Sequence, residues 1–142
     1  MGTWGTGAFD NDNASDFAMT LDELPQEQRY SAIGAELEAA IHEEGPLYGE
    51  VAIAAAALVA AQCPNGEPCD EIYGPQKPLP RLPTELRLLA LQAIDRVTGP
   101  DSYLPELWAE GSKDSEWRAG MHRLRTVLTA ALEHPNQLPL AP

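Results

Sequence analysis

The sequence predicts an all-α fold, a single-domain bundle of five or six helices with a long proline-rich loop. Apolar residues recur at helical spacing in several segments, and no segment shows the alternation of a half-buried strand. Gly and Pro residues separate these segments, as they do between helices. A chain of 142 residues is the size of one ordinary domain, so we expect residues 1–142 to form a single helical domain.

Two helices are expected in the N-terminal third. Residues 1–12, rich in Gly and Thr, are predicted to be an extended clasp that closes onto the core. Asn13 is a suitable cap for the helix that follows, and Asp16 then lies in its first turn, where the helix dipole favours a carboxylate. Pro25 opens a second helix that Gly45 and Pro46 end. Its apolar stripe comprises Tyr30, Ile33, Leu37, Ala40 and Ile41.

The middle of the chain combines a buried helix with a long loop. Residues 47–62 are apolar nearly all round and rich in alanine, which predicts the central helix of the bundle. Residues 63–83 contain six prolines and are predicted to form a surface loop with polyproline character. The loop holds Cys63 and Cys69, and we expect reduced thiols because the chain shows no export signal.

Three further helices are expected in the second half. Residues 84–98 form one, capped by Thr84, and residues 102–111 form a short one. The last helix begins at Asp114 or Ser115, and residues 133–142 are predicted to be a loose tail. The residues expected to face inward are Leu86, Leu89, Ala90, Ala93, Ile94 and Val97 in the first of these helices, and Trp117, Met121, Leu124, Leu128 and Ala131 in the last.

The net charge of −13 belongs entirely to the first half of the chain. Residues 1–76 contain 14 acidic residues and one basic residue, Arg29, whereas residues 77–142 contain eight of each. This sign argues against nucleic acid as a ligand, since phosphate contacts need basic residues. No run of 18 apolar residues predicts a membrane span, and a cytoplasmic location is expected. A protein partner, and in particular a basic one, fits the acidic half.

The opening GTWGTGAFDNDNASDF, residues 2–17, resembles the start of the domain of unknown function 4259 family, which carries a WGxGxFxND-type motif. A second stretch, SYLPELWAEGSKDSEWRAGMHRL, is similar to the family's closing pattern. The resemblance implies no activity, because it brings no established function with it. The matching residues are Trp4, Gly5, Gly7, Phe9, Asn11, Asp12 and Asp16 at the start, and Glu106, Leu107, Trp108, Glu116 and Trp117 near the end.

Asp10, Asp12 and Asp16 leave two interpretations open. With His42 they offer ligands for a divalent cation, as in a metal-dependent hydrolase. Their spacing departs from a calcium loop, however, because Ser15 stands where that loop has glycine. The favoured interpretation is structural: the aspartates cap a helix or pair with arginines of the later helices, and aromatic residues anchor the clasp. The arginines are Arg87, Arg96, Arg118 and Arg125, and the clasp residues are Trp4, Gly5, Gly7, Phe9, Asp12 and Trp117.

A protein-interaction surface is the function that the sequence favours over catalysis. No order of Ser, His and Asp, no phosphate-binding glycine loop and no zinc motif is present, so we expect no catalytic residue and no cofactor. A separate basic edge carries Arg118, His122 and Arg125, which either bind an anion or pair with acidic residues of the chain. The predicted partner-binding residues are Glu36, Glu38, Glu43 and Glu44.

Overall fold

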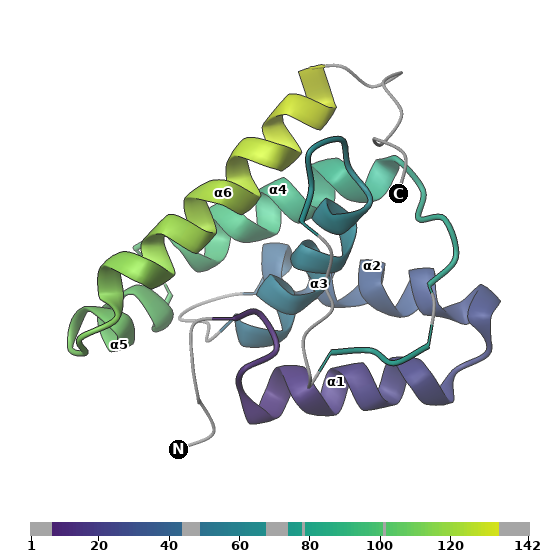
Figure 1. Ribbon diagram of the computed structural model, residues 1–142, viewed down its shortest axis with the longest axis horizontal. Coiled ribbons are helices and arrows are strands. Elements are labelled where there is room, and N and C mark those ends of the chain that lie inside the picture. The colour runs from purple at the N-terminus through teal and green to yellow at the C-terminus, as the bar shows by residue number, and fades with distance from the viewer. Residues whose placement is uncertain (1–6, 44–48, 68–73, 78, 101, 134–142) are drawn as a thin grey trace.

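The computed structural model describes residues 7–43, 49–67, 74–77, 79–100 and 102–133, and contains six α-helices and no β-strand within them (Figure 1). The predicted all-α fold is confirmed. The outermost part of the predicted clasp and residues 134–142 of the predicted loose tail lie outside the described residues. The helices are α1 (Asp12–Glu23), α2 (Gln26–His42), α3 (Glu50–Ala61), α4 (Glu85–Val97), α5 (Leu104–Ala109) and α6 (Asp114–Glu133).

Helix α3 is the central element, as its composition predicts. Every residue from 52 to 60 is buried, and α3 packs against α1, α2, α4 and α6. Figure 1 shows α3 in the middle of the molecule, with α1 on one side and α6 on the other. Gly49 precedes the helix with a φ of 84°, in the left-handed region that glycine adopts without penalty. A Cβ at Gly49 would collide with the side chain of Val97, so the start of α3 packs in close contact with α4.

Helix α1 begins two residues earlier than the sequence predicts. Asn11, with extended backbone, caps it: its side-chain oxygen accepts a hydrogen bond from the Ala14 backbone N–H at 2.8 Å. The prediction that Asn13 caps this helix is wrong. The Asn13 side chain instead donates to Glu50 at 3.0 Å and links α1 to the start of α3.

One buried residue of α2, Arg29, is charged and is not part of the predicted apolar stripe. Arg29 is 7% exposed, whereas Tyr30, predicted to face inward, is 42% exposed. The Nε of Arg29 donates to the carbonyls of Leu21 and Leu24 at 2.9 and 3.1 Å. These carbonyls lie at the C-terminal end of α1, where the Leu21 carbonyl also accepts the Leu24 N–H at 3.2 Å, so Arg29 adds a charged donor to this helix end. The rest of the predicted stripe is buried or half-buried, and comprises Ile33, Leu37, Ala40 and Ile41.

The described parts of the predicted loop, within residues 63–83, contain no helix and are held by side chains from other elements. The carboxylate of Asp22 in α1 accepts the backbone N–H groups of Gln76 and Lys77, each at 2.9 Å. At the end of α3, the Gln62 side chain donates to the Pro80 carbonyl at 3.0 Å and accepts the Leu82 N–H at 2.8 Å. The loop is thus fastened to the helices at two points.

Cys63 lies at the beginning of this loop as a buried free thiol, and its Sγ donates to the Val59 carbonyl at 3.4 Å. Burial raises the pKa of Cys63, and the positive charge of Arg87 partly offsets that rise. The same burial makes Cys63 a core residue rather than a reactive surface group. Cys69, its predicted neighbour in the loop, lies outside the described residues.

The helices of the second half bury or partly bury the predicted residues, with two differences that both concern α4. In α4, Arg87 is buried although the predicted face omits it, and Thr84 makes no side-chain capping bond. In α6, Trp117 is 3% exposed and stacks on Trp108, with the ring centres 5.8 Å apart and an angle of 10° between the planes. None of the helices within the described residues has the length and apolar character needed to cross a membrane. The inward residues of α6 are Trp117, Met121, Leu128 and Ala131, with Leu124 half-buried.

Candidate interaction surfaces

The four candidate metal ligands, Asp10, Asp12, Asp16 and His42, lie in different parts of the structure. Asp10 bends back, and its Oδ2 accepts the Gly7 N–H at 3.1 Å. Asp12 and Asp16 are exposed on α1, and His42 is exposed in the last turn of α2. Among the described residues, no three His, Cys, Asp or Glu side chains are grouped so that they could hold a metal ion. The structure therefore does not bring these four residues together.

The prediction that the N-terminal aspartates pair with arginines of the later helices is wrong. Arg118 pairs with Asp114 at 2.9 Å, and Arg125 pairs with Asp95 at 2.7 Å. No ion pair between described residues includes any of the three aspartates. The reason is geometric, because α1, which carries two of them, and α6 lie on opposite sides of α3 (Figure 1).

Two of the predicted clasp residues lie in the hydrophobic core. Phe9 is 0% exposed and Trp117 is 3% exposed, and both belong to the same cluster of buried residues. Phe9 therefore fixes the chain directly before α1 to the body of the molecule. Gly7 provides the N–H that Asp10 accepts, so this segment turns back on itself. Trp4 and Gly5 lie outside the described residues.

The predicted partner-binding glutamates lie along α2 and just beyond its end. Glu38 and Glu43 are exposed and Glu36 is half-buried, while Glu44 lies outside the described residues. The backbone carbonyl of Glu43 accepts a hydrogen bond from Arg96 of α4 at 3.2 Å, which holds the end of α2 in place. The Glu43 side chain stays exposed beyond that contact.

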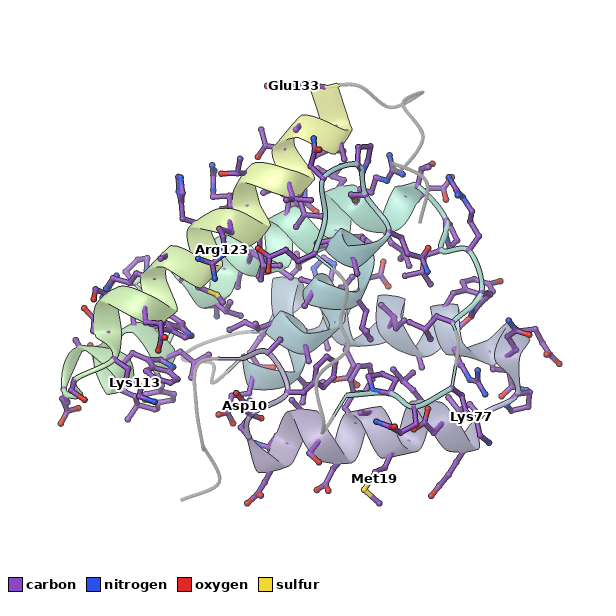
Figure 2. All side chains as sticks on the ribbon, viewed as in Figure 1. Asp10, Met19, Lys77, Lys113, Arg123 and Glu133 are labelled. Carbon is purple, nitrogen blue, oxygen red and sulfur yellow. The ribbon has the colours of Figure 1, made fainter. Side chains whose placement is uncertain are left out.

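Sequence reasoning missed a second acidic row, on the outer side of α1. Asp12, Asp16, Met19 and Glu23 are all exposed and follow one another at spacings of four, three and four residues. This spacing places them along one side of a helix. Met19 is 60% exposed, and Figure 2 shows its side chain pointing away from the molecule. The helical spacing of these four residues is present in the sequence, but their exposure depends on how α1 packs in the folded protein.

The exposed carboxylates of α1 and α2 form no ion pair with a Lys or Arg among the described residues. Arg29 is the only such residue in positions 1–76, and the end of α1 occupies its Nε. Among the described residues, the exposed Asp, Glu, Lys and Arg side chains of α1 and α2 are therefore all acidic. The exposed acidic residues of these two helices are Asp12, Asp16, Glu23, Glu27 and Glu38, and Glu43 follows directly.

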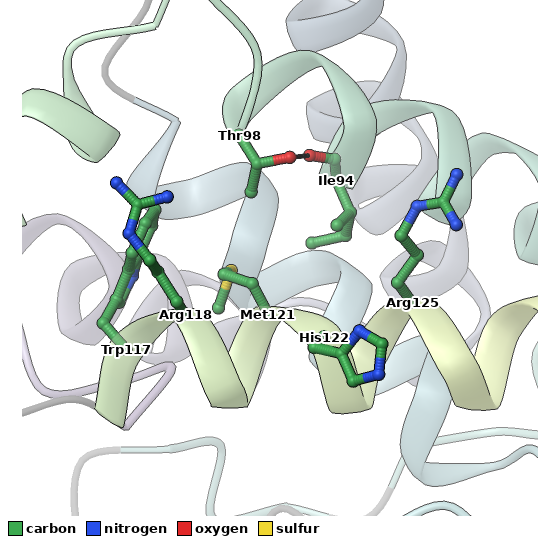
Figure 3. A pocket seen from close by; sticks show the side chains of 7 residues that line it. All are labelled: Ile94, Thr98, Trp117, Arg118, Met121, His122 and Arg125. Carbon is green, nitrogen blue, oxygen red and sulfur yellow. Dashed lines mark hydrogen bonds between the residues drawn. The ribbon is translucent and has the colours of Figure 1, made fainter. Parts of the chain in front are cut away.

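On the opposite side, two adjoining hollows lie along α6, and only the first is also lined by residues at the end of α4. The first, of about 150 Å³, has an apolar floor that includes Trp117 and Met121 (Figure 3). The second, of about 270 Å³, continues along α6 as far as Glu133. His122 and Arg125 line both hollows, so the two form one groove, here called the α4–α6 groove. The hydrogen bond with Asp95 raises the pKa of Arg125, which is fully charged.

Comparison with known proteins identifies the family. The family model named Domain of unknown function (DUF4259) matches residues 2–120, and the chain belongs to this family. The match extends into α6 and confirms the predicted family. No curated protein and no solved structure matches the chain.

Proposed function

We propose that this member of the DUF4259 family is a non-enzymatic interaction module that binds a basic protein through the exposed carboxylates of α1 and α2. The proposed contact surface combines the predicted glutamates of α2 with the row on α1, and is called the acidic face below. Its residues are Asp12, Asp16, Met19 and Glu23 on α1, and Glu36, Glu38, Glu43 and Glu44 on or after α2.

One observation carries this proposal: the only arginine or lysine of the first 76 residues is buried. Arg29 is 7% exposed and donates to the end of α1, so it places little positive charge on the exposed surface of this half. Uncompensated charges of one sign produce a field that steers an oppositely charged partner and raises its association rate. The field falls off within about 8 Å at physiological ionic strength, so it acts mainly on a partner that docks closely.

Met19 gives the acidic face an apolar centre. Its flexible thioether side chain is 60% exposed between Asp16 and Glu23 on the same side of α1. Methionine adapts its shape to an apolar partner surface, while surrounding carboxylates select for basic residues. A partner that fits this arrangement presents Lys or Arg residues around an apolar side chain.

The test compares two triple variants that remove the same charge from different places. Asp12→Asn/Asp16→Asn/Glu23→Gln neutralises the row on α1. Glu106→Gln/Glu110→Gln/Glu116→Gln neutralises three exposed carboxylates of the second half, and serves as the matched control. Affinity purification from cell extract, followed by binding measurements with the purified partner, is carried out over a range of salt concentrations.

We expect a basic partner whose affinity falls as salt rises, and falls again in the α1 variant. A loss of about tenfold corresponds to roughly 1.4 kcal/mol, which three exposed charges acting together can supply. The control variant keeps the wild-type affinity. Equal losses in both variants, or binding that salt does not affect, would contradict the proposed surface.

A further inference from the structure

The α4–α6 groove combines features that the proposed acidic face does not use. Its first hollow has an apolar floor formed by Ile94, Trp117 and Met121, all buried. Its rim carries Arg118, His122 and Arg125 along one edge of α6, at spacings of four and three residues. Figure 3 shows the two guanidinium groups toward the two ends of the hollow, with His122 between them. An apolar floor beneath basic groups is suited to an amphiphilic anion.

The two arginines are held in place and keep donors available. Arg118 bonds Asp114 through Nε, and the main bond of Arg125 to Asp95 also uses Nε, at 2.7 Å. A guanidinium has five N–H donors, so the terminal nitrogens retain most of theirs. A side chain that is already oriented loses less conformational entropy when it binds a ligand. The ion pairs therefore orient these guanidinium groups without using up their donors.

The size of the groove limits the ligand to a small molecule or a single side chain. The two hollows have volumes of about 150 and 270 Å³, and the apolar floor belongs to the smaller one. A flat ring fits such a floor beside Trp117, and a carboxylate matches the planar fork of a guanidinium. Glu133 lies at the far end of the second hollow and disfavours an anion there, which places the carboxylate near Arg118, His122 and Arg125.

We propose that the α4–α6 groove binds a small aromatic carboxylate, with the ring on the floor formed by Ile94, Trp117 and Met121. The carboxylate accepts hydrogen bonds from Arg125 and from Arg118 or His122. This site is distinct from the acidic face and has the opposite charge preference.

Phenylacetate is the probe, and two related molecules separate its parts. 2-Phenylethanol keeps the ring without the charge, and acetate keeps the charge without the ring. Chemical shifts of backbone amides and of the Trp indole groups are followed by NMR during titration of the intact protein. The variants are Arg125→Gln and the matched control Arg123→Gln, which removes the same charge from a neighbouring residue that does not line either hollow. Arg123 instead pairs with Glu67 at 3.5 Å.

We expect saturable shifts with phenylacetate, centred on the Trp117 indole and the amides of residues 118–126. 2-Phenylethanol and acetate each bind at least about tenfold more weakly. Arg125→Gln weakens phenylacetate binding about tenfold, in line with a lost charge-assisted hydrogen bond, and Arg123→Gln leaves it within about twofold.

Three results would overturn the proposal. Phenylacetate shifts that do not saturate up to tens of millimolar would show that the groove is not a site. Equal shifts with 2-phenylethanol would show that the basic rim does not select the charge. An equal loss in Arg123→Gln and Arg125→Gln would assign binding to the general charge of α6. Thermal melting of both variants confirms that each remains folded before titration.

Discussion

The two halves of this chain treat their arginines in opposite ways. The first half buries its single arginine, and the exposed carboxylates of α1 and α2 form no ion pair with a Lys or Arg among the described residues. The second half exposes Arg118 and Arg125 and pairs each with a carboxylate of the same half. These two arginines are thus compensated within their own half, whereas Arg123 pairs with Glu67 of the first half. The first half, with its large net charge, leaves that charge exposed on its surface. We therefore expect the acidic face to bind a basic partner and the α4–α6 groove to bind an anion.

The same contrast exists inside the molecule. Arg29 and Arg87 are each 7% exposed, one in each half. Arg29 donates to two carbonyls at the end of α1, whereas Nη1 of Arg87 is buried without a hydrogen-bond partner among the described residues. Burying a charge is costly unless hydrogen bonds compensate for its lost hydration. We therefore expect the two arginines to have opposite effects on stability.

The largest effect is expected at Gly49, where the first half meets the second. In Gly49→Ala, the new Cβ lies within 2.7 Å of the Val97 Cβ, and the residue must keep a positive φ. Overpacking and the left-handed backbone together cost about 4 kcal/mol. Urea unfolding measures the change. In the control Gly120→Ala, the nearest atom is 3.7 Å away in α6, and we expect a gain of about 0.5 kcal/mol. Similar destabilisation in both variants would contradict the close contact between α3 and α4.

Arg29→Met is expected to destabilise the protein by about 3 kcal/mol, because the end of α1 loses the charged donor that bonds the carbonyls of Leu21 and Leu24. Equilibrium unfolding in urea measures this change, and amide hydrogen exchange reports whether α1 opens before the rest. Arg29→Lys should recover part of the loss, since an ammonium can reach one carbonyl but not both in the same geometry. An unchanged unfolding midpoint in Arg29→Met would show that the end of α1 does not depend on this side chain.

Asp22→Asn tests how α1 fastens the proline-rich loop at residues 74–77. The carboxylate accepts from the N–H groups of Gln76 and Lys77, and an amide offers one oxygen in place of two. We expect a loss of about 1 kcal/mol in global stability. Limited proteolysis should show faster cleavage near residues 74–77. The control Asp16→Asn removes an exposed carboxylate from the same helix, and cleavage there should match the wild type.

Arg87→Met is expected to stabilise the protein by about 1 kcal/mol, the reverse of the effect at Arg29. Methionine retains much of the volume and removes a buried charge whose Nη1 has no partner among the described residues. Urea unfolding of both variants under the same conditions provides the comparison. Destabilisation of Arg87→Met similar to that of Arg29→Met would mean that the buried charge of Arg87 is compensated.

The smallest effect concerns Cys63 and appears only at alkaline pH. Burial raises the pKa of Cys63, so the folded protein favours the neutral thiol and loses stability as the pH rises through this raised value. In a Cys69→Ala background, the melting temperature should fall at alkaline pH, and Cys63→Ala should remove that component. Since Arg87 lowers the pKa of Cys63, Arg87→Met should raise it further, as measured by thiolate absorbance. A lower thiol pKa in Arg87→Met would contradict this.

The sequence predicted the helices well because their signals are local. The alanine run of α3 and the spacing of Ile33, Leu37 and Ala40 depend only on which neighbours are apolar. The exchange of Tyr30 for Arg29 on the buried side of α2 depends on the end of α1, which needs a donor that only the tertiary structure places there. The local sequence does not show where a hydrogen-bond donor from another helix is required.

The sites were harder to predict for a related reason. The spacing of Asp12 and Asp16 suits a metal site, a capping role and an exposed row equally well, and only the arrangement of the helices separates these possibilities. The basic edge of α6 was visible in the sequence, with both outcomes left open. The apolar floor beneath it requires Ile94 of α4, which lies far from α6 in the sequence. Residues that meet only after folding therefore complete this site.

The composition of α3 has a consequence for communication between the two sides of the molecule. Six of the nine residues from 52 to 60 are alanine, and α3 lies between α1 and α6. Alanine has no alternative rotamers, so this layer lacks the discrete side-chain rearrangements through which packed cores transmit allosteric signals. Binding at the acidic face and binding in the groove should therefore be thermodynamically independent. A single chain would then hold two ligands at once, each with the affinity that it has alone.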